Sequence, residues 1–206
     1  AFYSCTALET LDIPNTVKEI GNSAFASCES VTTIHLPEDG CHVGSYLFEY
    51  DNSIKEAYVP AGLYGEEGQD TYYMFHKCSG LETITFAEGI TEIPKGTCLS
   101  CGSLTKINFP EGLESIGMGA FSDCASLTKV TFPDSLKRIG NSVFHEDPVL
   151  TEAILPPNLE AIEIHAFRNC PQLRNIGTVP KSLTEVGSSA FANSGLVEVT
   201  LEDGRE

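Results

Sequence analysis

The stretch CASLTKVTFPDSLKRIGNSVF, residues 124–144, decides the fold because it repeats the stretch that precedes it. Residues 101–121 read CGSLTKINFPEGLESIGMGAF, and the two align without a gap at an offset of 23 residues. Internal repetition at a period of about 20–50 residues is typical of solenoids, propellers and repeat arrays. If the chain contains further copies, the fold is built from the repeat as its unit, and not from individual helices or strands.

Copies of this stretch run along the whole chain. Each is anchored by a phenylalanine, with a cysteine in that place in one copy, and the anchors are Phe2, Phe25, Phe48, Phe75, Cys98, Phe121, Phe144, Phe167 and Phe191. The anchors are spaced by 23 residues, except for one interval of 27 and one of 24. This regularity predicts a single domain over residues 1–206, made of about eight to nine repeats. Because the chain starts within a repeat, we expect it to be a fragment of a longer protein.

Each unit reads L-x-x-I-x-L-P and then carries a second apolar pair, such as Leu136 and Ile139. The I-x-L part alternates with a period of two, which predicts a short strand, and the proline after it ends strand pairing. Such a unit is long enough for one coil with a strand on one side and a return on the other, but it cannot bury its apolar face alone. Stacked coils bury that face against each other, so we expect a solenoid whose anchor phenylalanines stack as a spine.

The complete pattern, L-x-x-I-x-L-P-x-x-L-x-x-I-G-x-x-A-F-x-x-C, resembles the BspA-type leucine-rich repeat, a class with 23-residue units. The copies between Cys78 and Phe167 match it closely, and the resemblance covers essentially the whole chain. It implies an α/β or mainly β repeat solenoid, wound as a right-handed leucine-rich-repeat superhelix with a parallel sheet of short strands on one face.

The resemblance also implies a function. Proteins of this family are surface or secreted proteins of bacteria and some protozoa that bind host proteins or other cells. We therefore expect a non-catalytic protein-binding or adhesion module of a bacterial cell-surface or secreted protein, which uses the strand face. The alternatives are a structural spacer or stalk that displays another domain, and a domain appended to an enzyme.

The charge of the chain limits its partners. Asp and Glu number 29 against 12 Lys and Arg, and the formal net charge is −17. Such a surface repels the phosphate backbone of nucleic acids and anionic lipid head groups. No run of 18 apolar residues is present, so we expect no membrane insertion. A protein or a glycan-bearing surface remains as the expected partner, with nucleic acid excluded.

Six of the eight cysteines share one position, three residues after the anchor. They are Cys5, Cys28, Cys78, Cys101, Cys124 and Cys170, and other copies place Asp51, Asp147 and Ser194 there. All three residue types are small and can hydrogen-bond to nearby backbone, which predicts an inward row of buried free thiols. Disulfides between neighbouring coils are the alternative, since stacked coils bring Cα atoms within range. The replaced copies would then leave cysteines unpaired.

The residues offer no catalytic constellation. Cys98 and Cys101 form a C-x-x-C pair, but no second pair follows at zinc spacing, and the repeat explains both positions. The five histidines fall at different repeat positions, which predicts surface histidines. The motifs G-x-S-x-G, H-E-x-x-H and the P-loop are absent. We therefore expect no enzyme activity, no metal and no cofactor.

One repeat carries four extra residues, between Ala61 and Phe75. Insertions in solenoids map to loops, and loops carry function more often than cores do. This one combines aromatic and acidic residues: Tyr64, Tyr72, Tyr73, Glu66, Glu67 and Asp70. It predicts either an interface loop or a divergent acidic turn, and the segment EEGQD could also bind calcium weakly.

The x positions of L-x-x-I-x-L point outward from the strands. Threonine dominates them, which strand propensity alone also explains. Lys106 and Lys129 should lie on adjacent coils, with Lys55 and Arg174 further along, and such a basic spot on an acidic molecule favours recognition of a partner. The predicted ligand-binding residues are Lys55, Tyr58, Thr83, Thr85, Thr105, Lys106, Asn108, Thr128, Lys129, Thr131 and Arg174.

Overall fold

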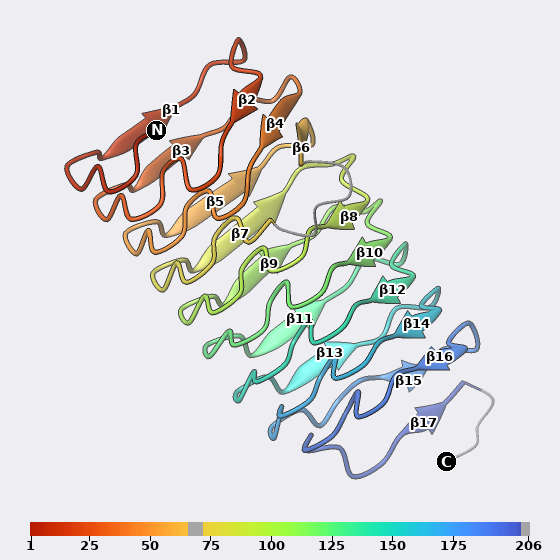
Figure 1. The fold of residues 1–206 in the computed structure, drawn as a ribbon. Coiled ribbons are helices and arrows are strands. Elements are labelled where there is room, and N and C mark those ends of the chain that lie inside the picture. The colour runs from red at the N-terminus through yellow and green to blue at the C-terminus, as the bar shows by residue number, and fades with distance from the viewer. Residues whose placement is uncertain (66–71, 203–206) are drawn as a thin grey trace.

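The computed structural model describes residues 1–65 and 72–202. The chain winds into a solenoid of stacked coils, in which each coil carries a short strand on one side and a return segment on the other (Figure 1). Among the described residues the regular elements are all strands, and none forms a helix. Of the two fold classes expected, the mainly β solenoid is therefore the one that this chain adopts.

The strands of the outward face come from successive coils; those up to residue 154 lie in line along the solenoid, and the last two lie closer to the return strands (Figure 1). They are β1 (Thr10–Asp12), β3 (Thr33–His35), β5 (Glu56–Val59), β7 (Thr83–Phe86), β9 (Lys106–Asn108), β11 (Lys129–Thr131), β13 (Glu152–Ile154), β15 (Thr178–Val179) and β17 (Thr200–Leu201). All their pairings are parallel, and equivalent repeat positions face each other, as Val130 and Ala153 do. Strand pairing is continuous within four sets, namely β1–β3, β5–β7–β9, β11–β13 and β15–β17.

The return segments form a second parallel sheet from strands that are mostly two residues long. They are β2 (Glu19–Ile20), β4 (Cys41–Val43), β6 (Leu63–Tyr64), β8 (Glu92–Ile93), β10 (Ser115–Ile116), β12 (Arg138–Ile139), β14 (Ala161–Ile162) and β16 (Glu185–Val186). This sheet is divided into β2–β4–β6 and β8–β10–β12–β14–β16. The division falls where the chain carries the four extra residues.

The coil that ends in β4 lacks the usual apolar pair at the expected spacing after Pro37, where Gly40 and Val43 stand. The structure fills this place with Cys41, which is fully buried beside the buried Val43. Cys41 thus packs in the core but lies outside the row formed by the other cysteines. A thiol here acts as a small apolar side chain.

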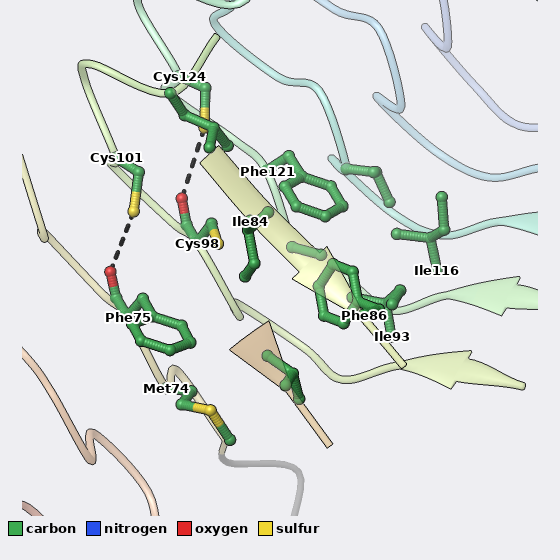
Figure 2. Packing of buried hydrophobic residues seen from close by; sticks show 14 of the residues in the cluster. Met74, Phe75, Ile84, Phe86, Ile93, Cys98, Cys101, Ile116, Phe121 and Cys124 are labelled. Carbon is green, nitrogen blue, oxygen red and sulfur yellow. Dashed lines mark hydrogen bonds between the residues drawn. The ribbon is translucent and has the colours of Figure 1, made fainter. Parts of the chain in front are cut away.

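The anchor phenylalanines stack as the predicted spine. Neighbouring rings lie nearly parallel, with centroids 5.2–5.8 Å apart, in Phe2–Phe25–Phe48–Phe75 and in Phe121–Phe144–Phe167–Phe191. Cys98 occupies the slot between the two stacks, as Figure 2 shows. A second column, Phe86–Phe109–Phe132, meets the spine edge-on at Phe121. Continuous aromatic contact therefore runs through nearly every coil interface.

The row of cysteines points inward, as predicted, and all eight cysteines are free thiols. The thiols of Cys78, Cys101 and Cys170 each donate a hydrogen bond of 2.9–3.1 Å to the carbonyl oxygen of the anchor phenylalanine in the preceding coil. Cys124 does the same to the carbonyl of Cys98 at 3.5 Å (Figure 2). Burial raises the pKa of these thiols, to about 12 for Cys170. Each thiol therefore keeps the proton with which it ties one coil to the next.

Asp51 and Asp147 replace cysteine in this row and are fully buried. In each, Oδ1 accepts a hydrogen bond from the backbone N–H of the equivalent cysteine one coil earlier, Cys28 at 2.6 Å and Cys124 at 2.7 Å. The other oxygen, Oδ2, is buried without a hydrogen-bond partner. Burial raises the pKa of Asp51 to about 7 and that of Asp147 well above its usual range. Protonation would make these carboxyls donors, like the thiols that they replace.

The thiols provide a direct test of this core. Only the thiolate form of cysteine reacts quickly. Burial keeps the reagent away from the thiol and also disfavours its ionisation to the thiolate. We expect a disulfide reagent such as 5,5′-dithiobis(2-nitrobenzoate) to label Cys5, the one half-buried thiol, rapidly in the native chain, and all eight after unfolding in urea. Rapid labelling of several thiols in the native chain would contradict the buried row.

Candidate functional site

The outward strand face presents three columns of side chains, one residue per coil in each. The first column holds Glu9, Thr32, Lys55, Glu82, Thr105, Thr128, Thr151 and Arg174, the second holds Thr10, Thr33, Glu56, Thr83, Lys106, Lys129, Glu152 and Asn175, and the third holds Asp12, His35, Tyr58, Thr85, Asn108, Thr131, Ile154 and Gly177. Pairing with a shift of one repeat keeps each column in register. All eleven sequence-predicted residues lie on this face, and eight are exposed, while Thr83, Thr85 and Asn108 are half-buried.

Ion pairs between neighbouring coils neutralise part of the predicted basic spot. Lys55 pairs with Glu82 at 3.0 Å, and Lys129 pairs with Glu152. The hydrogen bond from Lys129 lowers the pKa of Glu152. Within residues 1–65 and 72–202, Lys106 and Arg174 take part in no ion pair. The free positive charge of this face therefore comes from these two side chains.

Threonine hydroxyls in the first column bond mainly to the backbone of the preceding coil. Thr105 donates to the carbonyl of Glu82 at 3.2 Å, and Thr151 donates to that of Thr128 at 2.9 Å. In the third column the Asn108 side-chain amide donates to the Thr85 hydroxyl at 2.8 Å. These groups stabilise the stack of coils and offer less hydrogen-bonding capacity to a ligand.

What remains for recognition is a sparse set of exposed groups. Tyr58 is 50% exposed and Ile154 is 40% exposed, both in the third column. Together with Lys106 and Arg174 they combine aromatic, aliphatic and cationic surface, and tyrosine and arginine are favoured at the centre of protein interfaces. A rigid strand face can present such groups in a fixed geometry.

A second cluster, which sequence reasoning missed, lies where the chain turns toward the anchors Phe48 and Phe75. We call it the aromatic corner, and it consists of Tyr46, Glu49, Tyr50, Tyr73, His76 and Lys77. The rings of Tyr46 and Tyr73 stack in parallel at 5.1 Å, and His76 contacts Tyr46, Tyr50 and Tyr73. The His76 side chain is only 14% exposed, so the prediction of a surface histidine is wrong for this residue. Aromatic residues at positions where other copies carry mostly small or short polar residues were the signal in the sequence.

Of the predicted interface loop and calcium segment, Glu66, Glu67 and Asp70 lie outside the described residues, whereas Tyr73 belongs to the aromatic corner and Tyr72 lines an apolar hollow. This hollow of about 220 Å³ lies next to the division of the return sheet and is lined by residues that include Val59, Met74 and Phe86. No group of three or more His, Cys, Asp or Glu side chains in the described part of the chain could hold a metal ion. Cys98 and Cys101 are both fully buried.

These features define a leucine-rich-repeat solenoid with a strand face on one side and short returns on the other. The family described as "BspA type Leucine rich repeat region (6 copies)" matches residues 1–101 and 91–205. The chain belongs to this family. Comparison with curated protein sequences finds no match.

Solved structures of bacterial leucine-rich-repeat proteins share the fold. A leucine-rich cell surface protein from Faecalibacterium prausnitzii is 25% identical with a TM-score of 0.58, over 96% of this chain and 62% of that one. The pneumococcal vaccine antigen PcpA is 20% identical with a TM-score of 0.50, over 96% of this chain and 60% of that one. The chain thus spans about three fifths of the length of these structures. Within the described residues, no helix is long and apolar enough to cross a bilayer.

Proposed function

We propose that the chain is a non-catalytic protein-binding or adhesion module of a bacterial cell-surface or secreted protein. The observation that carries the proposal is the outward strand face, where one scaffold holds Tyr58, Lys106 and Arg174 exposed on the same side. The location is supported by the family, whose members are typically cell-surface proteins, and by the structural neighbour described as a cell surface protein.

The partner we propose is a protein with an acidic or mixed surface. Lys106 and Arg174 form no ion pair within residues 1–65 and 72–202, and the net charge of the chain is −17, so these two cations attract carboxylates of a partner that the rest of the molecule repels. A specific interface buries about 800 Å² per partner, which requires several neighbouring coils. The long strand face supplies that area without a cleft.

A structural spacer is the second candidate, and it is favoured by how the strand face uses its polar groups. The pairs Lys55–Glu82 and Lys129–Glu152 and the threonine hydroxyls bond within the solenoid. Polar groups that bond within the solenoid in this way stiffen it, and fewer of them are left to form hydrogen bonds or ion pairs with a partner. The two candidates differ in whether charges on this face affect binding.

Charge reversal on the strand face separates the two candidates. We expect the double variant Lys106→Glu/Lys129→Glu to weaken binding at least tenfold to whichever protein the native chain binds in a panel of purified extracellular-matrix proteins, measured by surface plasmon resonance. The reason is that the variant places carboxylates opposite the carboxylates of the partner, and like charges repel each other.

The matched control is Lys18→Glu/Lys137→Glu, which makes the same change of net charge away from the strand face. Lys137 also pairs with a glutamate of a neighbouring coil, Glu114 at 2.9 Å, so both variants break one such pair. If the two double variants weakened binding equally, or if the first left the affinity unchanged, the proposed role of the strand face in binding would be contradicted. No binding to any protein of the panel would favour the spacer.

A further inference from the structure

The aromatic corner departs from the repeat at backbone positions that are hostile to large side chains. Tyr46, Tyr50 and Tyr73 have φ values of 58°, 65° and 40°, and Lys77 has 57°. Bulky residues rarely occupy this left-handed region. The other coils have positive φ at these positions as well, so the large side chains, and not the backbone, set this corner apart.

Other coils place mostly small or short polar residues at the same positions. Two residues before the anchor they have Ser23, Gly96, Gly119, Ser142, His165 and Ser189, and two residues after it they have Ser4, Ser27, Ser100, Asp123, Glu146, Asn169 and Asn193. The fold therefore does not need an aromatic ring at these positions. Three tyrosines on two adjacent coils are a local addition to the repeat, in which the Tyr73 ring packs over Gly96 of the next coil and Tyr46 stacks on Tyr73.

The aromatic corner combines flat rings with side chains that donate hydrogen bonds and side chains that accept them. His76 Nδ1 and Glu49 Oε1 are 2.8 Å apart, and since the carboxylate only accepts, the histidine donates from Nδ1. Burial lowers the pKa of His76, which favours the neutral ring with an accepting lone pair on Nε2. Lys77 Nζ donates to the Tyr50 hydroxyl at 2.8 Å and lies 5.0 Å from the centre of that ring. Tyr50 itself is 43% exposed.

We propose that the aromatic corner binds a neutral sugar unit of a glycan. One face of a sugar ring is lined by C–H groups and packs on a tyrosine ring, while its hydroxyls, each both donor and acceptor, match Glu49, His76 and Lys77. The net charge of −17 disfavours sugars that carry carboxylate or sulfate groups. This site is separate from the outward strand face and goes beyond the proposed protein-binding function.

The repeat itself supplies the variant that tests the site. Tyr46→Ser/Tyr50→Ser/Tyr73→Gly gives each position a residue found at the equivalent place in other coils. We expect saturation-transfer NMR with the methyl glycosides of glucose, galactose, mannose and N-acetylglucosamine, at millimolar concentration, to show transfer to the ring protons of at least one. The triple variant should lose this signal at least tenfold while it keeps the circular dichroism spectrum of the native chain.

The control is Tyr58→Ser, an exposed tyrosine on the strand face, which should keep the sugar signal. A native chain that gives no signal with any of the four glycosides would overturn the proposal, as would a triple variant that retains the signal. None of these results depends on whether the strand face binds a protein.

Discussion

Truncation of Phe121 to alanine is expected to lower the free energy of unfolding by about 3–5 kcal/mol. Phe121 is fully buried, stacks on Phe144 at 5.8 Å and meets the rings of Phe86 and Phe109 edge-on. Its other neighbour in the spine is the small Cys98, so no second ring of the spine is available to fill the space (Figure 2). Urea unfolding followed by circular dichroism measures the change.

Met118→Ala is the matched control, because Met118 lies three residues before Phe121 and is 41% exposed. This variant should change stability by no more than about 0.5 kcal/mol. A loss of less than about 1 kcal/mol in Phe121→Ala would refute the buried spine. Since each coil contacts only its neighbours, the loss should fall on the unfolding of the coils around Phe121.

Replacement of Asp147 by asparagine is expected to stabilise the chain at pH 8 by about 1–3 kcal/mol, which is the usual cost of an unsatisfied buried polar group. The amide keeps the oxygen that accepts from the Cys124 N–H and gains an N–H in place of the unpartnered Oδ2. It therefore supplies the donor that aspartic acid offers only when protonated. The measurement is again urea unfolding, at a series of pH values.

The sign of the pH dependence follows from the raised pKa of Asp51 and Asp147. Between the usual value of 3.8 and the higher folded value, about 7 for Asp51, the unfolded chain has released the proton that the folded chain still holds. The contribution of each group is thus complete below about pH 4 and is lost as the pH rises through the folded pKa. Asp147→Asn should flatten this decline.

Two further variants keep this prediction open to contradiction. Asp134→Asn alters an exposed aspartate in the turn that follows Pro133 and should leave the pH dependence unchanged. Asp147→Cys restores the residue of the other coils and should also remove part of the decline, because a thiol at this depth keeps its proton. If neither Asp147 variant altered the difference in stability between pH 5 and pH 8, the protonated carboxyl would be excluded.

Much of the fold was predictable because the same pattern of buried and exposed positions recurs in every copy of the repeat. The 23-residue period, the phenylalanine spine and the inward cysteines each recur at fixed positions, and the structure confirms all three. The outward direction of residues such as Tyr58 and Lys106 was predictable as well, since alternation along a strand sets it. Their role in binding stays a prediction.

The candidate sites were less predictable, because they depend on which side chains meet across coils. The pairing of Lys129 with Glu152 removes half of a basic spot that the spacing of Lys106 and Lys129 suggested. Tyr46 and Tyr73 are 27 residues apart, and the four-residue insertion between them hides that they share one repeat position. Comparing equivalent positions of the repeats in the sequence detects the unusual tyrosines, but it does not show that their rings gather around His76.

Periodicity alone thus determines a stacked solenoid and its inward and outward positions, because burial in each coil depends on a local pattern that every copy repeats, and composition alone determines the strong negative charge. The tertiary structure decides what the exceptions do. Only stacking shows that Asp147 and Asp51 each bury an oxygen without a partner, that Cys41 fills a gap, and that three tyrosines meet at one corner. These outcomes depend on contacts between coils, and a single unit of the repeat does not contain them.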